Sequence, residues 1–143
     1  MPSVIFTATD VKERRTEVLE AAARDRALVR AVDGTALVFT RLDVVERLEA
    51  VGRWAIVLHQ LDQGVFPAPI GWAKHLDDDD RHEFVKELWQ LLDDLTNEAA
   101  DVQQLDETIA AWRASALAVA DPDRRQVLLG ETSARDFVPA RRP

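Results

Sequence analysis

The sequence contains no cysteine and no tyrosine, and it has only three histidines among 143 residues. Without cysteine, disulfide bonds, thiolate metal sites and cysteine nucleophiles are excluded. A nucleophile elbow, a phosphate loop, a zinc-helix motif and a dinucleotide fingerprint are also absent from the sequence. Because catalysis has few chemical groups to use here, we expect no enzyme, no catalytic residue, no cofactor and no metal site.

Long apolar runs are missing as well. No stretch of about 18 uncharged apolar residues occurs, so no membrane-spanning helix is predicted. The opening residues, MPSVIFTATD, lack the basic start and the apolar run of a signal peptide. Together with the absence of cysteine, these features predict a cytoplasmic protein. The apolar fraction of 47% is nevertheless sufficient for a real core in a chain of this length.

The net charge of −8 is distributed unevenly. Residues 1–53 contain nine Lys or Arg and nine Asp or Glu, so their charges cancel. The remaining residues contain nine Lys or Arg and seventeen Asp or Glu, which leaves −8. Because phosphate binding depends on local potential, only the first part is suited to DNA, provided that its arginines gather on one face. The acidic part is expected to face away from any DNA.

The first part of the chain predicts the order β-α-β-β-α. Asp10, three residues before Glu13, resembles a helix-start pattern, and Asp33-Gly34 between β-prone runs is a strong hairpin signal. The predicted elements are a strand at Ser3–Thr7, a helix from Val11 to about Arg24, strands at Ala27–Val32 and Thr35–Thr40, and a helix at about Asp43–Val51. We therefore place a small domain at residues 1–52.

A connecting segment is predicted at residues 53–76, where glycine and proline interrupt apolar residues. Within it, Trp54–Leu61 fits either a helix or a buried strand, because its periodicity does not decide between them. Gln63–Gly71 is the candidate linker. The segment separates the first domain from a region of different character.

An acidic helical domain is predicted at residues 77–130. It opens with Asp77–Asp80, and acidic residues suit a helix N-terminus because they complement its dipole. Apolar residues then follow at steps of three and four, as in a heptad seam: Phe84, Leu88, Leu91, Leu95, Val102, Leu105, Ile109, Trp112, Ala116 and Val119. Glu98 falls where an apolar residue is expected.

Two interpretations of this region remain open. The unbroken phase of the seam favours one long helix, whereas typical helix lengths favour a helical hairpin that turns near Thr96–Asn97. Asp121-Pro122 is predicted to end the last helix of the seam, and a further short helix is predicted at 123–129. The tail at 131–143 is predicted to be irregular. The fold class is thus α+β, a small β-α-β-β-α domain followed by an all-helical extension.

The β-α-β-β-α region also carries an ordered set of residues. The pieces are Ile5-Phe6-Thr7-Ala8, Lys12, Thr16-Glu17-Val18-Leu19, Gly34, Ala36–Phe39 and Glu46-Arg47-Leu48. With these residues, the first part of the chain resembles the N-terminal domain of the Phd/YefM-type (prevent-host-death) antitoxin family. The match covers residues 4–48. The resemblance implies a homodimer formed through the sheets, operator DNA contacted by the first helix, and a cognate toxin bound by the segment that follows.

The resemblance also implies candidate DNA-binding residues. Lys12 and Arg14 fall on the first-helix surface that the family uses for DNA, and Arg15 and Arg30 are further candidates. The structural alternative is a solvated surface on which these cations pair with neighbouring glutamates. For Arg30, decoration of the exposed side of a sheet is the favoured interpretation, because strand alternation places it on the same face as Leu28.

The four tryptophans all follow residue 53. Trp112 lies on the heptad seam, so helix–helix packing is the simplest interpretation, although large aromatic residues also anchor protein interfaces. Trp89, Leu105 and Trp112 are therefore the candidate partner-binding residues.

Two functional hypotheses follow. The first is an antitoxin-like transcriptional regulator of a toxin–antitoxin system, which binds operator DNA as a homodimer and neutralises a cognate toxin through its C-terminal helices. The alternative is a dimeric protein-interaction module that does not bind DNA. It is motivated by the net charge, by Val32-Asp33 where family members often carry a basic pair, and by Arg15 where they bury a leucine. A continuous basic first-helix face would favour the first hypothesis, and a mixed or acidic face would favour the second.

Overall fold

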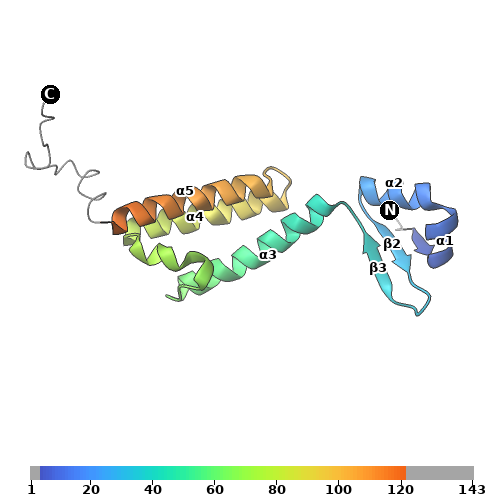
Figure 1. Cartoon of the computed structure of the whole chain (residues 1–143), viewed down its shortest axis with the longest axis horizontal. Helices are drawn as coiled ribbons and strands as arrows, with labels where there is room; N and C mark the ends of the chain where they lie inside the picture. The colour runs from blue at the N-terminus through green and yellow to red at the C-terminus, as the bar shows by residue number, and fades with distance from the viewer. Residues whose placement is uncertain (1–3, 122–143) are drawn as a thin grey trace, which may run out of the picture. The chain divides into compact units, whose positions relative to one another are not determined.

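The computed structural model describes residues 4–121. The chain divides into two compact units, Met1–Ala50 (unit 1) and Val51–Pro143 (unit 2), and the division falls within one helix (Figure 1). A three-stranded sheet is combined with several helices, which confirms the predicted α+β class. The predicted short helix at 123–129 and the predicted irregular tail at 131–143 lie outside the described residues.

Unit 1 contains the sheet. Its elements are β1 (Ile5–Thr7), α1 (Ala8–Glu13), α2 (Arg15–Arg24), β2 (Ala27–Arg30), β3 (Ala36–Phe39) and the start of α3 (Leu42–Asp62). β2 is the central strand, with β1 parallel to it and β3 antiparallel to it. The predicted order of strands and helices is therefore found, with one change: the first helix is split in two.

The split follows from how the first helix begins and ends. Thr7, not Asp10, is the N-cap: its hydroxyl accepts from the Asp10 backbone N–H, and the Asp10 carboxylate accepts from the Thr7 backbone N–H. This capping box starts α1 at Ala8, so the predicted start at Val11 with Asp10 as the cap is wrong. Arg14, at φ −116° and ψ 37°, then leaves the helical conformation, and α2 begins at Arg15.

The β2–β3 turn is a three-residue loop rather than the predicted two-residue Asp33-Gly34 turn. The Gly34 N–H donates to Ala31 O at 2.9 Å, and the Ala31 N–H donates to Thr35 O at 2.8 Å. Gly34 has a φ of 86°, whereas Asp33 lacks the positive φ that a type I′ turn requires at both central positions. Glycine is thus required at position 34, but as a left-handed bulge after the turn.

The core of unit 1 lies on one face of the sheet. Strand alternation and the register place Phe6 and Val29 on the face that packs against Val18 and Ala22 of α2. Figure 1 shows α1 and α2 on this one side of the strands. Because the core contains few large side chains, each of them contributes a large share of the stability of unit 1.

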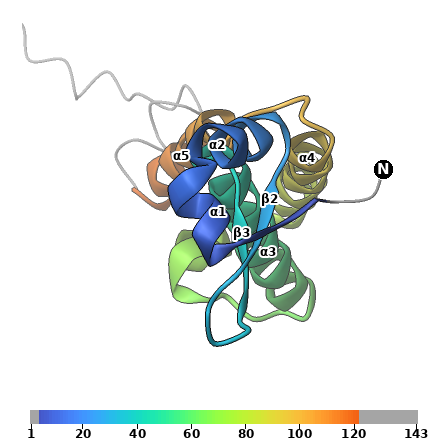
Figure 2. The same ribbon diagram turned by 90° about the vertical axis from the view of Figure 1, so that its right-hand side faces the viewer.

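Unit 2 is entirely helical within the described residues. After α3, it contains the 3₁₀ helix η1 (Ala68–His75) and the helices α4 (Asp78–Thr96) and α5 (Val102–Ala120). Figure 1 shows α4 and α5 running side by side, joined by the loop at 97–101, and Figure 2 shows both helices closer to end-on. The helical hairpin is therefore the correct interpretation of the seam, and a single long helix is wrong.

The predicted connecting segment at 53–76 is wrong, because these residues belong to the folded unit. Trp54–Leu61 is helical and continues α3, and Leu58 and Ile70 have no exposed surface. The physical reason lies at Gly64, which ends α3 with a φ of 79°. Its N–H donates to Leu61 O, and the Val65 N–H donates to Gln60 O, both at 2.9 Å. The glycine in the predicted linker Gln63–Gly71 is thus a helix C-cap of the Schellman type.

The turn between α4 and α5 uses the same motif without a glycine. The Glu98 N–H donates to Leu95 O at 3.3 Å and the Ala99 N–H donates to Asp94 O at 2.7 Å, while Glu98 has a φ of 60°. The residue that broke the apolar pattern is therefore the left-handed residue that ends α4. Asp77 caps α4, as its acidic start predicts, and Asp101 forms a capping box with Gln104 at the start of α5.

Replacing Glu98 with glycine is expected to stabilise unit 2 by about 0.5–1 kcal/mol. Glycine adopts the left-handed conformation without the steric cost of a Cβ, and part of this gain is offset by the greater freedom of glycine in the unfolded chain. Thermal unfolding followed by tryptophan fluorescence measures the change. Glu98→Ala is the matched control: it removes the same carboxylate but keeps the Cβ, so it should not be stabilising. Equal stability of the two variants would contradict the conformational explanation.

Candidate DNA-binding and partner-binding residues

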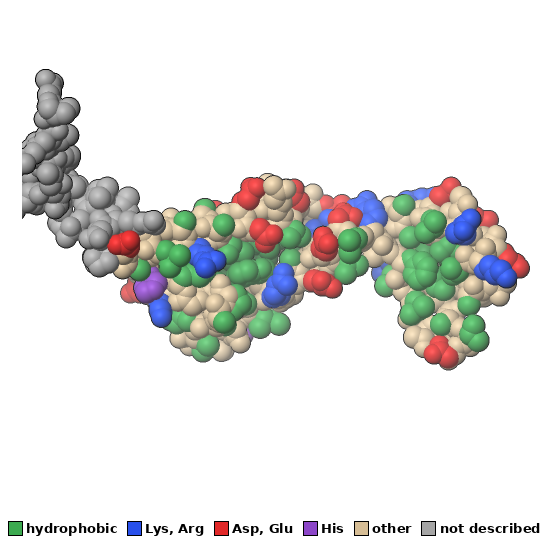
Figure 3. All heavy atoms as spheres, viewed as in Figure 1, with side chains coloured by type: hydrophobic (Ala, Val, Ile, Leu, Met, Phe, Trp, Pro, Cys, Tyr) green, Lys and Arg blue, Asp and Glu red, His purple; other side chains and the backbone are tan. Residues whose placement is uncertain are grey.

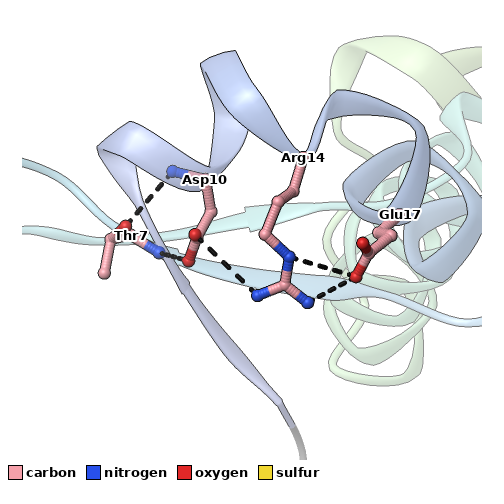
Figure 4. Close-up of polar contacts among 4 residues, drawn as sticks. All are labelled: Thr7, Asp10, Arg14 and Glu17. Atoms are coloured by element: carbon pink, nitrogen blue, oxygen red, sulfur yellow. Dashed lines mark hydrogen bonds and ion pairs between the residues drawn. The ribbon is translucent and has the colours of Figure 1, made fainter.

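Arg14 is held by contacts within unit 1. Its guanidinium forms a salt bridge with Glu17, through Nε at 3.1 Å and also through Nη2, and lies 3.8 Å from Asp10 (Figure 4). The Arg14 Cζ also lies 5.5 Å from the centroid of the Phe6 ring. Arg14 therefore connects the capping box of α1 to the first turn of α2. A phosphate contact by Arg14 would have to compete with two carboxylates.

This network shifts the pKa values of its carboxyl groups. The hydrogen bond from the Thr7 backbone N–H is the main cause that lowers the pKa of Asp10 below its ordinary value of 3.8. The hydrogen bond from the Arg14 side chain is the main cause that lowers the pKa of Glu17 below 4.5. Both carboxylates are solvent-accessible, so water screens part of these interactions. The charged forms are nevertheless the ones that the fold favours.

Unit 1 is expected to lose stability on acidification, from near pH 4.5 down through the lowered folded-state pKa values. A carboxyl group with a lowered folded-state pKa stabilises the fold above its unfolded pKa, and that contribution is lost as the pH falls through the folded pKa. Urea midpoints measured from the NMR signals of β2 and β3, between about pH 6 and about pH 3, test this. Asp10→Asn should be less stable at neutral pH and show a weaker pH dependence. An unchanged dependence would contradict the role of Asp10.

The other three predicted DNA-binding residues occupy different elements. Lys12 lies in the last turn of α1, Arg15 is the first residue of α2, and Arg30 is the last residue of β2. All three are exposed. The exposure of Arg15 follows from the split of the helix, because Val11 and Arg15 no longer share one helical stripe. Arg30 lies opposite Thr7 in the register and donates to the Gly34 carbonyl at 3.2 Å.

The charges on α1 and α2 are balanced. Residues 8–24 carry four cations and four carboxylates: Lys12, Arg14, Arg15 and Arg24 against Asp10, Glu13, Glu17 and Glu20. On the face of unit 1 that Figure 3 shows, cationic and acidic side chains are interspersed around an apolar area. Of the cations on these two helices, Lys12, Arg15 and Arg24 form no ion pair and no side-chain hydrogen bond with any other described residue. These three are the cations that remain available to an external anion.

The sheet has a second apolar face, which was not predicted from the sequence. The register aligns Ile5, Leu28 and Val38 across the three strands, on the side opposite the core. Ile5 and Val38 are each 56% exposed, and Leu28 is half-buried. We call these three residues the open face. The alternation of apolar residues on both sides of each strand was the signal that could have revealed it.

The three predicted partner-binding residues differ in their accessibility. Leu105 has no exposed surface and belongs to the core of unit 2. Trp112 is half-buried: the centroid of its ring lies 5.8 Å from that of Phe84, and its Nε1 donates to the Glu87 carboxylate at 2.8 Å. Trp89 is 44% exposed. Of the three, only Trp89 offers a large accessible surface, and the prediction of Leu105 as a partner-binding residue is wrong.

The described residues contain no group of three or more histidine, aspartate or glutamate side chains placed to hold a metal ion. None of the described helices combines the length and apolar character required to cross a membrane. Comparison of the chain with known protein families, with curated proteins and with solved structures finds no match. The Phd/YefM resemblance therefore stays a prediction.

Proposed function

We propose that this protein is an antitoxin-like transcriptional regulator: unit 1 is a Phd/YefM-like domain that forms a homodimer and binds operator DNA, and unit 2 binds a partner protein, a cognate toxin. The observation that carries the proposal is the open face. A sheet in a small domain that is covered by helices on one side leaves its second apolar face in water. A second copy would cover Ile5 and Val38 in both protomers at once, because a two-fold interface uses the same patch twice.

The DNA-binding part of the proposal rests on the available cations. Lys12 and Arg15 are exposed, lie near each other in the sequence and have no partner among the described residues. A dimer presents each of them twice, which allows contacts to phosphates on two half-sites. Arg14 is a positioning residue in this scheme, because its salt bridge with Glu17 joins α1 to α2.

The dimer is tested with a charge on the open face. Val38→Asp should convert a dimer to a monomer in sedimentation or light-scattering measurements, because it would place two carboxylates in one apolar interface. Val32→Asp is the matched control, since Val32 is 95% exposed in the turn and lies outside the open face. A monomeric wild-type chain, or a Val38→Asp variant that stays dimeric, would be inconsistent with this interface.

The DNA interaction is tested by anisotropy titrations with DNA from the region upstream of the gene, over a range of salt concentrations. Lys12→Ala combined with Arg15→Ala should weaken DNA binding. The slope of the logarithm of the binding constant against the logarithm of the salt concentration should become shallower by about one for each lost phosphate contact. Lys86→Ala combined with Arg113→Ala removes the same charge from unit 2 and should have little effect. DNA binding that is indifferent to Lys12 and Arg15 would contradict their assignment.

The alternative function is a dimeric interaction module that does not bind DNA. It is favoured by the equal numbers of cations and carboxylates on α1 and α2 and by the engagement of Arg14 within the fold. A chain that is dimeric through the open face but binds no DNA at low salt would establish this alternative. The product of the adjacent gene would then be the first candidate for the partner.

A further inference from the structure

A groove with a volume of about 820 Å³ follows α4 on the surface of unit 2. It is lined by α4 between Glu83 and Asp94 and by Thr108 of α5. At a rise of about 1.5 Å per residue, this part of α4 is about 16 Å long. The groove therefore has the length of about three helical turns, which is enough to accept a short helix.

The lining of the groove is negatively charged. It contains four carboxylates against one cation, Lys86, so its net charge is one minus four, or −3. Two of these carboxylates have partners within the unit: Glu87 accepts from Trp112 Nε1 at 2.8 Å, and Asp94 accepts from Gln90 at 3.1 Å. The other two, Glu83 and Asp93, have no partner among the described residues. They are the acceptors that the fold leaves available.

Trp89 is the aromatic surface of the groove. It is 44% exposed, and no cation in the described part of the chain stacks on its ring. The two arginines that stack on aromatic rings there are Arg14, on Phe6, and Arg81, on Phe66. An indole face attracts a guanidinium or ammonium group, and it does so more strongly when the site is partly desolvated. Leu91, which is half-buried, adds an apolar contact in the same groove. A tryptophan, carboxylates and a leucine that line one groove have the chemistry to bind an arginine within an apolar segment.

We propose that this groove, which we call the α4 groove, is the docking site for a cationic amphipathic helix of the partner protein. Arginine or lysine of that helix packs on Trp89 and pairs with Glu83 and Asp93, while its apolar residues contact Leu91. The inference rests on the proposed partner-binding role of unit 2, but not on DNA binding by unit 1. It specifies the chemistry of the partner surface as cationic and apolar.

Charge complementarity selects this occupant over a second copy of the same unit or a nucleic acid. The described part of unit 2, residues 51–121, contains five Lys or Arg and fourteen Asp or Glu, which gives five minus fourteen, or −9. A second acidic unit or a phosphate backbone would bring like charges together in the groove, whereas a cationic helix would neutralise Glu83 and Asp93.

The probe for this site is a synthetic amphipathic peptide of about four turns, with arginine and leucine on one face and alanine elsewhere. A matched peptide carries glutamate in place of arginine. Anisotropy titrations with the full chain should show one arginine peptide bound per protomer, with an affinity that falls as salt is raised, and at least about tenfold weaker binding of the glutamate peptide. Equal binding of the two peptides would overturn the proposal.

Variants locate the bound peptide. Trp89→Ala, and separately Glu83→Gln with Asp93→Asn, should each weaken binding at least about fivefold, which is about 1 kcal/mol. Asp79→Asn with Asp80→Asn is the matched control, because it removes the same charge from exposed positions of α4 outside the groove. Its effect should be smaller than that of the groove variants, because Asp79 and Asp80 do not line the groove and their exposed charges are partly screened. If the control weakens binding as much as the groove variants, the attraction is general to the acidic unit and the α4 groove is not the site.

The test also separates this inference from the proposed function. A chain that is dimeric and binds its upstream DNA, but binds the arginine peptide no better than the glutamate peptide, overturns the α4 groove alone. A chain that binds the arginine peptide through Trp89 but is monomeric and binds no DNA overturns the proposed function and leaves the α4 groove established.

Discussion

Replacing Phe84 with alanine is expected to lower the free energy of unfolding of unit 2 by about 3–5 kcal/mol. Phe84 has no exposed surface. Its ring packs edge-on against Trp72, with the ring centroids 5.2 Å apart, and tilted against Trp112, with the ring centroids 5.8 Å apart. It thus joins η1, α4 and α5 at one point. Truncation removes these aromatic contacts and leaves a cavity among rigid rings that cannot collapse to fill it.

Denaturation followed by tryptophan fluorescence measures this loss, because all four tryptophans, Trp54, Trp72, Trp89 and Trp112, lie in unit 2. Trp89→Ala is the matched control: it removes a larger side chain from the same helix, but one that is 44% exposed, so it should cost less than about 1 kcal/mol. If both substitutions have the same effect, the aromatic cluster around Phe84 does not hold the three helices together.

Replacing Phe6 with alanine is expected to unfold unit 1 at room temperature. Phe6 is 4% exposed and packs with Val18 and Val29, which are the other large buried side chains of its core cluster. The loss of about 3–5 kcal/mol is comparable to the whole stability that a domain of this size can have. Arg14 would also lose the ring on which its guanidinium lies.

The loss of unit 1 should appear as the collapse of the dispersed amide signals of β2 and β3 in an NMR spectrum. Val32→Ala provides the control, because Val32 belongs to the same unit and is 95% exposed. It should leave these signals unchanged. Retention of the dispersed signals in Phe6→Ala would show that the open face or another contact, and not the Phe6 core, holds the sheet together.

The elements that local sequence signals determine were predicted well. The order of strands in unit 1, the presence of a hairpin at Gly34 and the acidic start of α4 are as expected, although the first helix is split and the hairpin loop has three residues. Each depends on interactions within a few residues, such as a cap, a left-handed glycine or strand alternation. Where the local signal was ambiguous, the prediction failed: Thr7 and Asp10 competed as helix caps, and the capping box between them decided in favour of Thr7.

The segment at 53–76 shows a different kind of failure. Gly64 was interpreted as part of a linker because glycine interrupts helical periodicity, yet it ends α3 and lets the chain turn back into the unit. The same left-handed motif at Glu98 carries no glycine, so only the interrupted apolar pattern and typical helix lengths indicated a turn near it. A left-handed non-glycine residue has a steric cost, so it persists only where the surrounding structure determines the backbone conformation.

The sequence alone determined that this protein has no cysteine chemistry and an acidic second half, and it predicted the α+β order of its first part and the helical seam of its second. Tertiary structure decided which of its residues are available for binding. Arg14 is engaged by Glu17, Leu105 is buried, and Ile5, Val38 and Trp89 remain exposed. Sequence periodicity shows which residues share a face, but whether that face is covered depends on elements far away in the chain. Leu105 becomes buried, and Trp89 stays accessible, only when α4, α5 and η1 pack together.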